Sequence, residues 1–170
     1  VPGRDEEWKK QTNANTSETQ FEQEYGNSFL GTGTTLINSN TLLGMRSIDP
    51  DWNRDNINIY DRPVEGHAYV CTVDVSKGRG IDYSTFSVFD VSLQPFKQVA
   101  TFRDNMLSPM LLPDMINKYV KPYNEALVIV ENNAEGGTVA TQLHYDIEYP
   151  NVFVQGMTKQ EDIGVTMNRK

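Results

Sequence analysis

The clearest pattern along the chain is a change near residue 67 from polar, turn-rich sequence to short apolar runs. Apolar and alternating runs predict strands at 69–74, 86–91 and 99–102. Their connections are short, which favours antiparallel pairing. A fourth run, 127–130, is apolar throughout, as expected for a strand covered on both faces. A last short strand is predicted at 152–154.

Two amphipathic helices are predicted between these strands. One begins at Pro109 or Pro113, since proline is favoured in the first turn of a helix. The other follows the Gly136-Gly137 pair, which we interpret as allowing tight helix–sheet packing rather than phosphate binding. The order is β-β-β-α-β-α-β, an α/β fold with a mixed sheet.

The region before residue 67 has a different character. Residues 1–30 are polar and predicted to be helical, with Trp8, Phe21 and Tyr25 as packing anchors. Residues 31–66 are rich in Gly, Asn, Asp, Thr and Pro, which is typical of a connecting segment. The strands are therefore preceded by a short helical segment and a linker.

The amino-acid composition restricts the kinds of binding surface and site that the chain can have. The 170 residues are 38% hydrophobic and 22% charged, which is ordinary for a globular protein. A net charge of −8 excludes a broadly basic surface for nucleic acid, but not a local basic strip or an acidic site that meets phosphate through metal ions. A single cysteine, Cys71, excludes an internal disulfide and is expected in the core. No apolar run reaches membrane-spanning length.

Two acids follow apolar strands: Asp74 after the first and Glu131 after the fourth. If these strands are neighbours in a mixed sheet, both carboxylates project near one edge. Paired carboxylates are ligands for Mg²⁺ or Mn²⁺, and two such ions can activate water and stabilise a leaving oxygen. The alternative, that each acid is a solvated strand end or helix cap, remains open at this point.

The segment 74–83 adds basic residues beside the first acid. Its glycines allow a tight hairpin that presents Lys77 and Arg79 to phosphates and returns Asp82 near Asp74 on the second strand. An ordinary surface hairpin is the alternative. No phosphate-binding loop motif occurs in the chain, so we do not expect it to bind ATP.

The sheet order with these two acids resembles the ribonuclease H-like nuclease fold. The sequence is similar to the large terminase subunit of T-even-type tailed phages, the motor that cuts and packages viral DNA. The segments that carry this similarity are 16–31, 70–83, 111–125 and 128–133.

The resemblance implies roles for individual residues. Asp74 and Glu131 would be the catalytic, metal-binding carboxylates and Asp82 an auxiliary acid. From their place in the segment 74–83, we expect Lys77 and Arg79 to contact the DNA backbone. The family uses a third acid that would lie beyond the end of this chain, and its ATP-binding motifs would precede the first residue.

The same resemblance implies a division of the chain. Residues 1–60 would be the C-terminal tail of the packaging ATPase domain plus a linker, and residues 61–170 a C-terminally truncated nuclease domain. The expected activity is two-metal hydrolysis of concatemeric double-stranded DNA with Mg²⁺ or Mn²⁺, and without the third acid the chain is expected to cut weakly or not at all.

Expected partners are double-stranded DNA, a portal ring, a small terminase subunit and other large-subunit copies, at a procapsid in the host cytoplasm and without a membrane. Two alternatives remain: a non-catalytic docking or DNA-sensing module of the motor, and another ribonuclease H-like nuclease such as a junction resolvase.

Overall fold

The structure is a computed structural model that describes residues 37, 41, 44–132, 135–155 and 162–165. The sheet belongs to a compact unit that begins at Ile48. The helices predicted within residues 1–30, with Trp8, Phe21 and Tyr25, lie outside the described residues, so the assignment of residues 1–60 stays a prediction. In the described ranges, no helix combines the length and apolarity that a membrane span needs.

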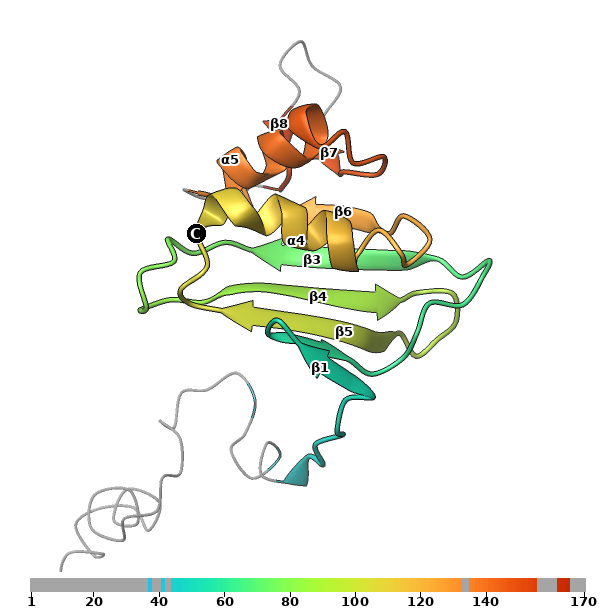
Figure 1. Cartoon of the computed structure of the whole chain (residues 1–170). Coiled ribbons are helices and arrows are strands. Elements are labelled where there is room, and N and C mark those ends of the chain that lie inside the picture. The colour runs from blue at the N-terminus through green and yellow to red at the C-terminus, as the bar shows by residue number, and fades with distance from the viewer. Residues whose placement is uncertain (1–36, 38–40, 42–43, 133–134, 156–161, 166–170) are drawn as a thin grey trace, which may run out of the picture. The chain divides into compact units, whose positions relative to one another are not determined.

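Six strands form one mixed sheet in the order β1-β2-β5-β4-β3-β6 (Figure 1). All neighbours are antiparallel except β3 and β6, which are parallel. The strands are β1 (Trp52–Arg54), β2 (Ile57–Ile59), β3 (Tyr69–Asp74), β4 (Ser84–Asp90), β5 (Lys97–Asp104) and β6 (Leu127–Val130). The prediction of a mixed sheet, in which the first predicted strand (β3) lies beside the fourth (β6), is confirmed.

The hairpin of β1 and β2 was not anticipated, because it falls in the segment interpreted as a linker. Its turn residues Asp55 and Asn56 both have positive φ, 54° and 61°, as the two-residue type I′ turn of a β-hairpin requires. β2 pairs with β5, so the sheet begins ahead of residue 61. Strands of three residues are too short to show the alternation that identifies longer ones.

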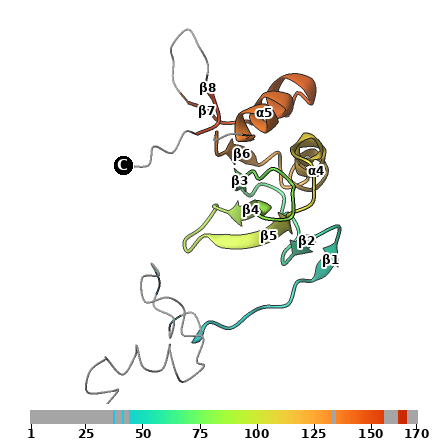
Figure 2. The same cartoon turned by 90° about the vertical axis from the view of Figure 1, so that its left-hand side faces the viewer.

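The described helices pack on one side of the sheet (Figure 2). A short 3₁₀ turn, η1 (Pro109–Leu111), leads into α4 (Leu112–Tyr119), and α5 (Gly136–Thr141) continues into a π-helical turn, η2 (Gln142–Asp146). Both prolines offered as helix starts are used, Pro109 in η1 and Pro113 in α4.

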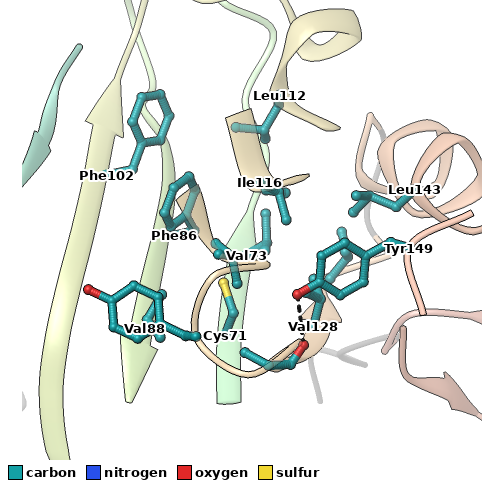
Figure 3. Close-up of a cluster of buried hydrophobic side chains, with 14 of the residues drawn as sticks. Cys71, Val73, Phe86, Val88, Phe102, Leu112, Ile116, Val128, Leu143 and Tyr149 are labelled. Carbon is teal, nitrogen blue, oxygen red and sulfur yellow. Dashed lines mark hydrogen bonds between the residues drawn. The ribbon is translucent and has the colours of Figure 1, made fainter. Parts of the chain in front are cut away.

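The core lies between these helices and the sheet (Figure 3). Cys71 is completely buried there, as predicted, and burial raises the pKa of its thiol. Beside it the Tyr149 hydroxyl donates a hydrogen bond of 3.1 Å to the carbonyl oxygen of Ala126. The fully buried large side chains include Ile57, Phe86, Val88, Phe102, Leu112, Ile116, Tyr123, Val128, Val130, Val139 and Leu143.

The opposite face of the sheet is polar and partly open. Along β6 only Val128 and Val130 are buried, whereas Leu127 and Ile129 are half-buried. The expectation that this strand is covered on both faces is therefore wrong for the described residues: its outer positions are apolar but half-buried, and Ile129 borders the hollow described below.

Two more strands lie beyond β6. β7 (Val154–Gln155) pairs antiparallel with β8 (Asp162–Ile163). Isolated parallel bridges join Val128 to Val152 and Glu131 to Val165. The last strand, predicted at 152–154, is thus split between a single bridge and β7.

Candidate functional site

Asp74 and Glu131 occupy equivalent positions on neighbouring parallel strands. The last register pair of β3 and β6 is Val73 with Val130, and the amide of Glu131 donates a hydrogen bond of 2.9 Å to the carbonyl of Val73. Residues at equivalent positions of neighbouring strands point to the same face, and their backbones are about 4.8 Å apart. Both acids line one hollow of about 320 Å³. The expected convergence at one edge of the sheet is confirmed.

The backbone around Glu131 is held from two further sides. The amide of Asn132 donates to the carbonyl of Val165 at 2.7 Å, and the amide of Val165 donates to the carbonyl of Val130 at 2.8 Å. On the helix side, a Cβ placed on Gly136 would lie 1.9 Å from the carbonyl oxygen of Glu131. Gly136 therefore serves close packing of α5 on the strand end, as the sequence indicated.

A second hollow, of about 580 Å³, lies along the loop of residues 75–83 and shares Asp74 with the first. Lys77, Arg79 and Asp82 also line it, so the loop places both cations and this acid around the hollow that Asp74 borders. The position of Asp82 differs from the prediction. It lies in the loop before β4, which begins at Ser84, and it does not line the hollow that contains Glu131.

The loop is longer than a tight hairpin because internal contacts stabilise it. At its base the buried Ser84 hydroxyl accepts a hydrogen bond of 3.0 Å from the Ser76 amide. Gly78 has φ of +62°, and a Cβ there would lie 2.3 Å from the carbonyl oxygen of Leu107. Only glycine combines this conformation with so close an approach. The cations are thus presented by a defined loop.

The donor set suits a divalent cation. Two carboxylates one strand spacing apart repel each other unless a cation lies between them, and carboxylate oxygens are the ligands that Mg²⁺ and Mn²⁺ prefer. Asp74 is exposed and Glu131 half-buried, so both can reach an ion in the hollow. Across the described part of the chain, no group of three or more His, Cys, Asp or Glu side chains forms a metal site. The described site is therefore a two-carboxylate site.

The histidines do not contribute to this site. His67 Nδ1 lies 2.6 Å from a carboxylate oxygen of Asp90, and this hydrogen bond, with a second from the Ser92 amide, lowers the pKa of Asp90 to about 2. The pair joins residues next to the start of β3 and the end of β4, whereas Asp74 is at the end of β3. His144 packs edge-on against Tyr145 in η2.

The sequence analysis did not identify one positively charged side chain near the site. Arg103 on β5 is opposite Thr85 of β4, which is itself opposite Asp74. Its guanidinium carbon lies 3.7 Å from the ring centroid of Tyr83. No local signal marks Arg103, because its relation to Asp74 depends on the register of three strands.

A family model decides the relationship of this chain to known proteins. The model described as the terminase RNase H-like domain matches residues 71–169, more than half of the chain. The chain belongs to this family. The match begins inside β3 and includes both acids, and this membership disfavours the junction-resolvase alternative.

Solved structures of terminase nucleases share the fold of this family member. The large terminase nuclease from thermophilic phage G20c with bound magnesium is 22% identical, with a TM-score of 0.50, over 61% of this chain and 52% of that chain. The cobalt-bound structure of the same nuclease is 19% identical, with a TM-score of 0.52, over 72% and 55%. The chain thus spans about half the length of these nucleases.

Proposed function

We propose that this chain is the metal-dependent endonuclease part of a phage terminase large subunit, which cuts concatemeric double-stranded DNA during packaging. The observation that carries the proposal is the placement of Asp74 and Glu131 at equivalent ends of two parallel strands, lining one hollow, in a chain of the terminase RNase H-like family. The solved G20c nucleases were crystallised with magnesium, zinc or cobalt, which supports a divalent cation here.

In this proposal Asp74 and Glu131 hold Mg²⁺ or Mn²⁺. When bound, such ions activate a water molecule and stabilise the leaving oxygen of a phosphodiester. Asp74 borders both hollows, one of which Glu131 also lines and the other of which Asp82 lines. Asp82 acts as the auxiliary acid in the second hollow, along the loop of residues 75–83, where it orients bound groups. Lys77 and Arg79 bind backbone phosphates without reading the base sequence.

The proposed partners follow from the family. They are double-stranded DNA, the portal ring, the small terminase subunit and further copies of the large subunit, at the procapsid in the host cytoplasm. A net charge of −8 weakens DNA binding, so the protein partners would add further basic surface for the DNA.

Metal binding is the first test, because it does not depend on turnover. Mg²⁺ and Mn²⁺ are titrated into the chain while its thermal midpoint is followed. A ligand that binds only the folded state raises this midpoint, and Asp74→Asn and Glu131→Gln should each abolish the rise. Glu65→Gln, at an exposed position outside both hollows, is the control and should leave it intact. A rise that survives in Asp74→Asn would place the ion elsewhere.

Cleavage separates the nuclease from a docking or DNA-sensing module. In the full-length terminase subunit, Asp74→Asn or Glu131→Gln should abolish plasmid cleavage while the circular dichroism spectrum stays unchanged. Normal cleavage by either variant would contradict the catalytic assignment and favour the docking module. The described residues supply two carboxylates to the site, so we expect the 170-residue chain to cut weakly or not at all, and strong cutting by it would show that two carboxylates suffice.

A further inference from the structure

Four residues on neighbouring strands form one row across the sheet, running from β6 to β5: Glu131, Asp74, Thr85 and Arg103. Asp74 is directly opposite Thr85, and Thr85 is directly opposite Arg103. Glu131 follows the register pair of Val73 and Val130 on the other side. Because residues opposite each other project to the same face, the cation at one end of the row shares a surface with the two carboxylates at the other.

Arg103 is held on this surface by an aromatic ring. Its guanidinium carbon lies 3.7 Å from the centroid of Tyr83, a distance typical of stacking with a cation–π contribution. Tyr83 lines the same hollow as Asp74, Lys77 and Arg79. Arg103 is exposed, and none of the ion pairs formed by the described residues includes it. Its charge is thus oriented but not neutralised by those residues.

We propose that Arg103, stacked on Tyr83, binds a backbone phosphate of the DNA strand that lies over Asp74 and Glu131. This inference rests on the proposed function. Two strand spacings separate the backbones of Asp74 and Arg103, about 10 Å. That length corresponds to about three nucleotides at 3.4 Å of axial rise each. A planar guanidinium binds phosphate with two parallel hydrogen bonds, which fixes the strand in position.

The proposed phosphate contact of Arg103 also explains why the ring of Tyr83 lies against its side chain. An exposed arginine side chain samples many rotamers, and ordering it on DNA carries an entropic penalty. Stacking on Tyr83 removes part of that freedom beforehand, so Tyr83 acts as a positioning residue for Arg103. The loop cations Lys77 and Arg79 line the same hollow as Tyr83, so in this proposal they bind further phosphates of the same DNA strand.

The test is DNA binding by the 170-residue chain, measured with a fluorescent 20-base-pair duplex in EDTA, at salt concentrations from 50 to 200 mM. Each phosphate contact contributes about 0.9 to the slope of log affinity against log salt. Arg103→Gln should therefore weaken DNA binding. The ratio of wild-type to variant affinity should be about 3.5-fold smaller at 200 mM salt than at 50 mM salt. Arg103→Lys should keep the slope, because the charge remains.

Arg54→Gln is the matched control. It removes the same charge from an exposed side chain on β1, opposite Ile57, whose side chain is in the helix-covered core. It should leave the slope at the wild-type value. Tyr83→Leu should reproduce part of the Arg103→Gln deficit, Tyr83→Phe should not, and Tyr83→Leu should have no further effect in the Arg103→Gln background.

The outcomes separate this inference from the function on which it rests. If the wild-type chain binds DNA and Arg103→Gln behaves like Arg54→Gln, the assignment of Arg103 is overturned while the nuclease proposal stands. If the wild-type chain binds no DNA at 50 mM salt, the assignment of Arg103 is overturned, and if it also binds neither Mg²⁺ nor Mn²⁺, the nuclease proposal is overturned with it. A slope change confined to Arg103→Gln and Tyr83→Leu supports the phosphate contact.

Discussion

Gly136→Ala tests whether close packing of α5 positions the strand end that carries Glu131, the proposed metal ligand. The added Cβ would lie 1.9 Å from the carbonyl oxygen of Glu131 and 3.1 Å from its carbon, both backbone atoms. An ordinary contact needs at least 3.4 Å, so helix and strand must separate by about 1.5 Å. In a helix interior this substitution stabilises by up to about 1 kcal/mol, and at Gly136, the first residue of α5, the gain is at most that.

The clash outweighs that helical gain. Overpacking of a well-packed interior typically destabilises by about 1–3 kcal/mol, and the atom in the way is a backbone carbonyl whose amide neighbours are hydrogen-bonded. We expect the free energy of unfolding to fall by about 1–2 kcal/mol in urea denaturation. The displaced Glu131 should also lower Mg²⁺ affinity about 10- to 100-fold, as changes behind a metal ligand commonly do.

Gly137→Ala is the internal comparison. Its Cβ would meet the Asn132 side-chain oxygen at 2.6 Å, and that oxygen can rotate away. Its effect on stability and on Mg²⁺ affinity should therefore be much smaller. A Gly136→Ala protein that is as stable as the wild type, and binds Mg²⁺ as well, would refute the argument that this contact positions Glu131.

Two further predictions concern other parts of the sheet. The pKa of Asp90, lowered to about 2 chiefly by the hydrogen bond with His67, lies below its unfolded value of 3.8, so its stabilising effect is present above about pH 4 and is lost as the pH falls towards 2. Asp90→Asn should weaken the acid dependence of the urea midpoint, and an unchanged profile would contradict this. Gly78→Ala combines a φ of +62° with a Cβ 2.3 Å from the carbonyl oxygen of Leu107 and should destabilise by about 1–3 kcal/mol. Gly66→Ala, at φ +80° with no atom within 4 Å of the added Cβ, should lower the free energy of unfolding by less. Equal decreases in the two variants would show that the contact with Leu107 is irrelevant.

The predictable parts of the fold are those with a repeating local pattern. β3 and β4 alternate in burial along most of their length and β5 over part of it, and all three were anticipated from their apolar positions. Asp74 and Glu131 could be selected because each follows an apolar run directly. Their proximity required only that β3 and β6 be neighbours in parallel.

The features that escaped prediction depend on contacts distant in sequence. The β1–β2 hairpin is recognisable by its pairing with β5 rather than by its own short strands. Asp82 was placed on β4, but the serine contact at the base of the loop and the approach of Gly78 to Leu107 hold a longer connection. Arg103 reaches the acidic row only through two successive registers, which no local pattern encodes.

The backbone at Glu131 is held in place from several sides, which suits its proposed role as a metal ligand. Gly136 approaches its carbonyl from the helix side, and a Cβ on Gly164, at φ +91°, would lie 2.6 Å from the carbonyl oxygen of Val130. With the hydrogen bond to Val73, three chain segments thus fix the strand end before any ion binds. Because backbone contacts provide this order, the hollow itself is left open around both carboxylates, and that combination of a rigid ligand and an accessible face is what positioning a phosphodiester requires.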